Sequence, residues 1–316
     1  MHPAKSVIFF TTSSGAGYGL LFALILGNIL SALPTYPYFL LSAYAVSFVL
    51  IGCGLLSSTF HLGHPERAWR ALSQWRSSWL SREGVLAVLT FVPAGIYASY
   101  LIFFSEEYFL SIEIIGVIAV VCCVSTVYCT AMIYASLKTV HAWSNWRVPA
   151  GYLLLSLTTG CVILSALMFF WGYQASFISV FAVALLLISA AWKHSYWQFL
   201  DRSKSASSPE SATGLGEFGK VRQFEVPHTE ANYLNKEMGF VVARKHSVRL
   251  RQIVFVCAFF VPAILLMLTL MLGAIGAGFA AGISIVSLAM GILVERWLFF
   301  AEAKHTVNLY YGAHEA

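Results

Sequence analysis

Six ionisable residues lie at the two ends of a polar segment that separates two apolar runs. They are His61, His64, Glu66, Arg67, Arg82 and Glu83. His61 directly follows Phe60, and Glu83 directly precedes the apolar run that begins at Gly84, so both side chains lie at the edge of an apolar region. Histidine titrates near neutral pH, and removal from water favours the protonated form of a carboxylate. This pair of residues can therefore take up and release protons.

Two interpretations fit this cluster. In the first, His61 and Glu83 hold the head group of a quinone, which needs an apolar cleft, hydrogen bonds to its carbonyl oxygens and a path for protons to water. Arg67, Arg82 and His64 would then lie around the bound ring. An ionisable group at the hydrocarbon boundary is costly and by default marks such a site. In the second, His61 and Glu83 only cap helix ends and pair with Arg67 or Arg82.

The elements that hold this cluster are membrane-spanning helices. Of the 316 residues, 59% are hydrophobic and 10% are charged, whereas a soluble domain carries roughly 25% charged residues. Apolar stretches of about 20 residues are long enough to cross a bilayer. We place them at 12–33, 37–60, 84–104, 112–137, 148–171, 175–192, 253–272 and 274–300. The sequence therefore predicts an all-α integral membrane protein with eight transmembrane helices.

Small residues and basic residues add detail to this fold. Gly15-x-x-x-Gly19 and Gly278-x-x-x-Gly282 permit close contact between helices. With eight spans, all 19 lysines and arginines fall on the side that holds both termini. By the positive-inside rule that side is the cytoplasm, so we predict a multi-pass protein of the bacterial inner membrane with N-in/C-in topology.

Two cytoplasmic segments connect the helices. Within 61–83, Trp69, Leu72 and Trp79 recur at helical spacing with arginines between them, which favours an amphipathic segment at the membrane surface. Residues 201–252 are polar and too few for an enzyme domain, so we interpret them as a docking loop. Residues 1–200 would hold the first six helices and the quinone-site region, and 253–316 the last two helices and the tail.

Several ligand classes are disfavoured. The six cysteines lie in apolar spans without a C-x-x-C pair, so we expect buried hydrophobic side chains and no metal site in this chain. None of the nine histidines lies deep in a span, which argues against haem. The run GLGEFGK at 214–220 resembles a phosphate-binding loop, but Val221 replaces the magnesium-binding hydroxyl residue. We expect no nucleic-acid partner.

A transporter is a distant alternative. Transporters commonly carry charged or polar residues deep in their spans and show internal repeats. We expect neither feature in this chain.

Two motifs resemble those of a known family. The motif HLGxPxRA at 61–68, followed by SxE at 81–83, is similar to the membrane anchor subunit of dimethyl sulfoxide reductase, which belongs with the polysulfide reductase and NrfD-like anchors. The opening HPAKSVIFFTTSSGAGYG and the closing ERWLFFAEAKHTVNLYYG extend the resemblance over the whole chain. These stretches are most similar to anchors of cytoplasmic sulfite dehydrogenase.

The resemblance implies a heterotrimer with an iron–sulfur subunit and a molybdopterin catalytic subunit. The molybdopterin guanine dinucleotide and the [4Fe-4S] clusters would belong to these partners. This chain would bind ubiquinone or menaquinone and hold no redox centre of its own. His61 and Glu83 match the family's quinone-site histidine and glutamate.

The resemblance also connects orientation with substrate. In the dimethyl sulfoxide reductase complexes of the family, the catalytic subunits face the periplasm, on the side of the His-Leu-Gly loop. Here that loop lies on the basic side, which predicts catalytic partners in the cytoplasm. This placement favours sulfite oxidation coupled to quinone reduction. The alternative is quinol oxidation in a dimethyl sulfoxide reductase-type complex.

Overall fold

The computed structural model describes residues 4–60, 62–104, 110–203, 207–225, 230, 245–311 and 313. Within these ranges the structure is all-helical and contains no strand. In this described part of the chain, eight helices are long and apolar enough to cross a membrane. The predicted eight-helix membrane fold is therefore confirmed.

Seven of the spans are single helices and one is composite. The single helices are α1 (Lys5–Ile29), α2 (Pro37–Thr59), α3 (Trp79–Phe103), α4 (Leu110–Ala135), α5 (Arg147–Phe170), α6 (Ser176–Arg202) and α12 (Ala274–Ala301). The seventh span consists of α10 (Ser247–Val254), the π-helical segment η3 (Phe255–Phe260) and α11 (Val261–Thr269). The short elements are η1 (Pro65–Gln74), α7 (Pro209–Thr213), η2 (Gly216–Phe218) and η4 (Thr306–Tyr311).

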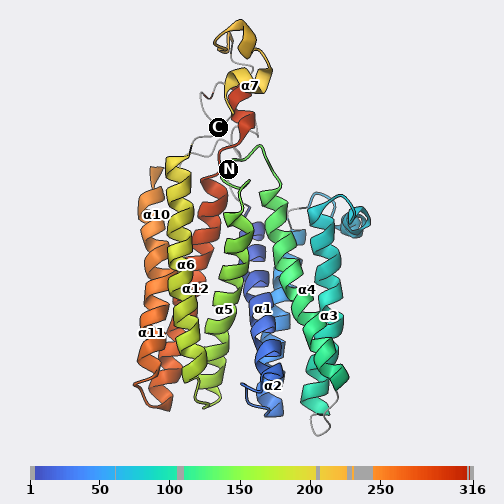
Figure 1. Cartoon of the computed structure of the whole chain (residues 1–316), viewed down its shortest axis with the longest axis vertical. Helices are drawn as coiled ribbons and strands as arrows, with labels where there is room; N and C mark the ends of the chain where they lie inside the picture. The colour runs from blue at the N-terminus through green and yellow to red at the C-terminus, as the bar shows by residue number, and fades with distance from the viewer. Residues whose placement is uncertain are drawn as a thin grey trace.

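Two helices form the centre of the bundle. In the most apolar part of α1, 72% of the residues are buried, and in α5 67%, compared with 28% in α3 and in α4. The helix α1 packs against α2, α4, α5 and α12, and Figure 1 shows it between α5 and α4. Both ends of the chain lie at the same end of the bundle, together with α7 and η1, and we call this end the docking end.

Glycines allow α1 and α5 to approach closely. A Cβ atom at Gly19 would lie 1.7 Å from the carbonyl oxygen of Ser156, and one at Gly160 would lie 2.1 Å from the carbonyl carbon of Gly19. A Cβ at Gly15 would meet nothing within 4 Å. Of the predicted Gly15-x-x-x-Gly19 pair, only Gly19 lies in a close helix contact.

Several helices extend further toward the docking end than the apolar stretches do. The first begins at Lys5 instead of 12, the third at Trp79 instead of 84, the seventh at Ser247 instead of 253, and α6 ends at Arg202 instead of 192. Hydropathy marks only the apolar part of a helix. The polar ends continue as helix because their side chains find partners: Arg251 pairs with Asp201 at 2.8 Å and with Glu302 at 2.9 Å.

The described part of the 61–83 segment, residues 62–83, consists of η1 and the start of α3 instead of one continuous helix. Residues 65–74 form the 3₁₀ helix η1, on which Trp69 is exposed. The helix α3 begins after Ser78. The Ser78 hydroxyl accepts a hydrogen bond from the Ser81 N–H at 3.4 Å and so caps the start of α3. Two contacts fasten η1 to α3: Ser81 donates to the Ala71 carbonyl, and Leu72 lies over Gly84.

Three of the cysteines, Cys123, Cys129 and Cys161, are buried between helices. Cys53 is exposed on the outer face of α2. The expectation of a buried side chain is therefore wrong for Cys53, because the outside of a membrane helix is itself an apolar environment.

Candidate functional site

Glu83 is a buried carboxylate near the docking end of the bundle. It lies in the second turn of α3, with 4% of the residue exposed. The hydroxyl of Thr130, on α4, donates a hydrogen bond to its Oε1 atom. The sequence predicts that Glu83 lies near the hydrocarbon boundary. Because α3 begins five residues before the apolar stretch, Glu83 is part of this helix, and its side chain is buried against α4.

The Thr130 hydroxyl has a choice of acceptors. It lies within hydrogen-bond distance of Glu83 Oε1 and, at 3.1 Å, of the Thr126 carbonyl oxygen. A hydroxyl has one hydrogen to donate. It can donate to an ionised Glu83, or donate to Thr126 and accept a hydrogen bond from a protonated Glu83. The site can therefore satisfy both protonation states of the carboxyl group without moving the backbone.

The other predicted site residues of the 61–83 segment lie elsewhere. His64, the residue before η1, and Arg67, on η1, are exposed and contact Glu66, at 3.0 and 3.8 Å. Arg82 donates to the backbone carbonyls of residues 75 and 76 and stacks on the Trp79 ring. His61 lies outside the described residues. The structure thus does not bring His64, Arg67 or Arg82 to Glu83, and their roles at a quinone stay predictions.

A small polar cavity lies behind Thr130. Its volume is about 30 Å³, and its lining includes Thr12, Tyr18, Thr130, Tyr152 and Arg296. Tyr18 lies near Thr126 and Tyr152 near Arg296, yet among the described residues no partner forms a well-aligned hydrogen bond with the hydroxyls of Thr12, Tyr18 and Tyr152. A polar cavity of this size holds about one water molecule. Buried hydroxyls that need partners make such a water favourable.

Glu83 adjoins this cavity through Thr130. The Thr130 hydroxyl lines the cavity and lies within hydrogen-bond distance of the Glu83 carboxylate. Glu83, Thr130 and the cavity therefore form one connected polar region inside the docking half of the bundle.

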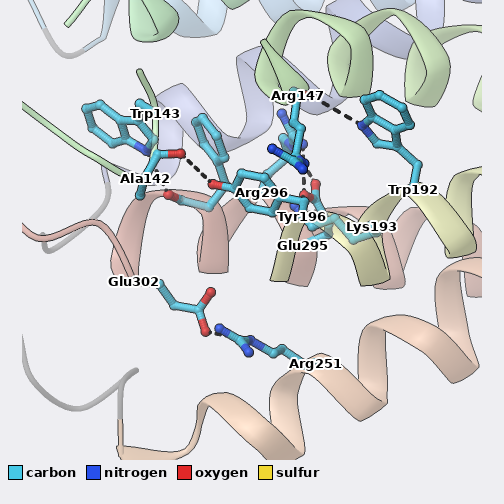
Figure 2. A network of polar contacts seen from close by, with 11 residues as sticks. Ala142, Trp143, Arg147, Trp192, Lys193, Tyr196, Arg251, Glu295, Arg296 and Glu302 are labelled. Atoms are coloured by element: carbon cyan, nitrogen blue, oxygen red, sulfur yellow. Dashed lines mark hydrogen bonds and ion pairs between the residues drawn. The ribbon is translucent and has the colours of Figure 1, made fainter. Parts of the chain in front are cut away.

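A buried group of three charges adjoins this region. Lys193, on α6, and Arg296, on α12, both pair with Glu295, and the three residues are 5%, 5% and 0% exposed. Arg296 binds the carboxylate with two nitrogens, at 2.5 and 2.8 Å. Figure 2 shows the two cations converging on Glu295. We call Lys193, Glu295 and Arg296 the charge triad.

Aromatic rings surround the triad. Arg296 lies 4.2 Å from the centre of the Tyr152 ring, and Lys193 lies 4.4 Å from that of Tyr196 and 5.1 Å from that of Trp197. The faces of aromatic rings attract cations. Two cations and one carboxylate leave a net charge of +1 away from water, and these rings partly compensate for it.

The triad differs from what the sequence predicts. The expectation that no charged side chain lies deep in a span is wrong, because Glu295 and Arg296 lie within α12 and Lys193 lies within α6. Two adjacent charges hardly change the mean hydropathy of a 28-residue helix. The signal that could have revealed them is the pair Glu295-Arg296 inside an apolar span, which needs a buried partner.

Comparison with known proteins assigns the chain to a family. Residues 1–212 match the model of the DMSO reductase anchor subunit (DmsC). The chain belongs to this anchor family. It is also 33% identical to a subunit of the sulfite dehydrogenase of Allochromatium vinosum, over 98% of this chain and 99% of that relative. No solved structure matches it significantly.

Membership in the family has consequences for the whole molecule. This anchor subunit is a multi-pass membrane protein of an oxidoreductase complex, and an anchor implies catalytic partner subunits. Membership in the anchor family argues against a transporter. The expected lack of buried charge no longer does so, because the charge triad is buried.

Proposed function

We propose that this anchor passes electrons between the iron–sulfur clusters of a partner subunit and the membrane quinone pool. The observation that carries the proposal is the buried carboxylate of Glu83, hydrogen-bonded by Thr130 near the docking end, within the residues 1–212 that match the anchor family. Anchors of this family generally bind quinone. The residues around Glu83 fit the proton chemistry of such a ligand, because they combine a titratable group, a hydroxyl that can donate or accept, and room for water.

Glu83 would hold and release the protons of the reaction. A bound quinone supplies a carrier whose reduction consumes protons and whose oxidation releases them. The Thr130 hydroxyl reorients when Glu83 changes its protonation state, so the carboxyl group keeps a hydrogen bond throughout. Burial excludes bulk water, and proton exchange is then limited to the groups that line the small cavity.

Sulfite is the substrate that we propose for the complex. The relative with 33% identity is named a sulfite dehydrogenase subunit, and the basic residues favour a cytoplasmic docking end. The family model carries the name of dimethyl sulfoxide reductase, and this supports the second candidate, quinol oxidation coupled to sulfoxide reduction. Assays of the purified complex for sulfite-dependent quinone reduction and for quinol-dependent sulfoxide reduction separate the two.

Replacement of Glu83 by glutamine tests the quinone proposal. The substitution Glu83→Gln keeps the size and the hydrogen bond to Thr130 but removes the titratable proton. Acid–base groups contribute on the order of 100- to 10,000-fold to a rate, so quinone-coupled turnover of the complex should fall within this range. Turnover with a soluble dye, which takes electrons from the catalytic subunits directly, should not change.

Glu66→Gln is the matched control, because Glu66 is exposed on η1 and belongs to the same segment. Its quinone turnover should equal that of the unmodified complex. Wild-type quinone turnover in Glu83→Gln would exclude Glu83 from the proton chemistry. A parallel fall of dye turnover would mean that Glu83 supports assembly. The variant His61→Ala, measured in the same assay, tests the predicted role of His61 at the quinone. This residue lies outside the described ranges.

A further inference from the structure

A second, larger cavity opens between α1, α4 and α5. Its volume is about 150 Å³, five times that of the cavity behind Thr130. Apolar side chains form most of its lining: Phe22, Cys123, Val124, Val127, Leu153 and Leu157. Polar side chains enter it only from Tyr18 and Ser156. We call this cavity the apolar slot.

The slot connects two environments. Tyr18, Val127 and Ser156 line both the slot and the small polar cavity, so the two adjoin. Val124, which also lines the slot, is 39% exposed on the outer surface of α4, where a membrane helix contacts lipid. Tyr18 lies near the middle of α1, so the slot lies deeper in the bilayer than Glu83.

The volumes decide which cavity could hold a ring. A dry apolar cavity of about 150 Å³ binds benzene in an engineered protein, so the slot has room for a bare six-membered ring. The substituents of a ubiquinone or the second ring of a menaquinone would have to extend out of the slot. The small cavity holds about one water molecule and cannot. A quinone has a polar-edged ring and an apolar tail, which matches a slot with a phenol at its inner end and lipid at its outer end.

We propose that the slot between α1, α4 and α5 binds the ring of the quinone, with a ring carbonyl toward the Tyr18 hydroxyl and the tail directed past Val124 into the lipid. This inference rests on the proposed function. Tyr18 is 2% exposed, and its hydroxyl lies near Thr126 without a well-aligned hydrogen bond among the described residues. A quinone carbonyl oxygen in the slot would compete with Thr126 as the acceptor of this hydroxyl. Thr130 and the small cavity then lie between the slot and Glu83, and they provide the route for protons.

Photolabelling of the wild-type complex locates the ring directly. A long-chain azidoquinone, irradiated with the intact complex in membranes, should label peptides that contain residues 123–127 and 153–157. Excess unlabelled quinone should suppress this labelling. Labelling confined to other helices would overturn the assignment of the slot.

Filling the slot tests it independently. Val124→Trp and Leu157→Trp place a large ring in the cavity, so both labelling and quinone-coupled turnover should fall at least tenfold while dye turnover is kept. Val117→Trp is the matched control, because Val117 is an exposed valine two turns away on α4 and does not line the slot. Wild-type labelling and turnover in both slot variants would contradict the proposal.

Tyr18→Phe keeps the size of the side chain and removes only the hydroxyl. This variant still tests the slot if the tryptophan substitutions disrupt folding. Loss of one hydrogen bond should raise the KM for quinone about fivefold, with labelling still in the slot. An unchanged KM would remove Tyr18 from the site. If the wild-type complex neither reacts with quinone nor is labelled in this chain, the proposed function itself fails. If it reacts and is labelled elsewhere, only the slot fails.

Discussion

At the residue scale, the charge triad shows how a membrane protein can bury three charged groups. Glu295 lies between Lys193 and Arg296, and each cation also faces an aromatic ring. Removal of one partner of a buried ion pair costs about 3–5 kcal/mol, because the other charge is left uncompensated. Because the triad holds two cations and one carboxylate, the loss of the carboxylate should destabilise the protein more than the loss of one cation.

Glu295→Gln should destabilise the anchor much more than Lys193→Met. The first change leaves two buried cations without a carboxylate and should cost about 3–5 kcal/mol. The second leaves Glu295 paired with Arg296, a neutral pair, and should cost less than about 1.5 kcal/mol. Thermal unfolding of the purified complex measures both. Equal losses of stability in the two variants would contradict this prediction. They would mean that Glu295 paired with Arg296 alone is not a stable buried pair.

At the element scale, backbone contact between central helices holds the bundle together. Where α1 crosses α5, Gly19 and Gly160 allow the main chains to touch. A second contact of this kind joins α12 to the seventh span, since a Cβ atom at Gly291 would lie 2.3 Å from the backbone nitrogen of Ala258. Ala258 belongs to the π-helical segment that precedes Pro262, and a proline lacks the N–H that would continue the regular pattern.

Gly19→Ala and Gly15→Ala test the central contact with the same substitution one turn apart. The added methyl at 19 meets the Ser156 carbonyl, so α1 and α5 must separate, and the loss should be about 3 kcal/mol. The methyl at 15 meets nothing within 4 Å, so stability should hold or rise slightly. The unfolding midpoints in detergent are the measurement. A stable Gly19→Ala protein would mean that this crossing is not tightly constrained.

At the scale of the whole molecule, basic residues are concentrated at one end. Both chain ends, η1 and α7 lie at the docking end (Figure 1), and Tyr310 of the C-terminal tail donates to the Ala212 carbonyl at 2.5 Å. The connections at the opposite end, at 30–36, 104–109, 171–175 and 270–273, contain no lysine or arginine. Glu83 and the charge triad lie in the half of the bundle nearer to the docking end.

Single cysteines at opposite ends test the proposed orientation. Gln223→Cys lies at the docking end and Thr35→Cys in the α1–α2 connection, and both positions are exposed. In intact spheroplasts a membrane-impermeant maleimide should label position 35 and leave position 223 unlabelled until the membrane is opened. Labelling of position 223 in intact spheroplasts would place the docking end in the periplasm and favour the sulfoxide reductase alternative.

Hydropathy, charge and motifs along the chain were enough to predict the number of helices, the side that holds the basic residues and the family. None of these features depends on which residues become neighbours in the folded protein. The same local pattern singled out Glu83, because a carboxylate beside an apolar run is unusual wherever the chain folds.

The partners of Glu83, in contrast, became visible only in the folded bundle. Thr130 is 47 positions away along the chain, and nothing in the sequence indicates that contact. The same holds for the triad, since Lys193 and Glu295 lie on different helices and become tolerable in a membrane only as a pair. Arginines close to Glu83 in sequence instead face the surface, because successive positions on a helix point in different directions. Side-chain partners in a helical bundle are set by packing between helices, and a single sequence does not encode them locally.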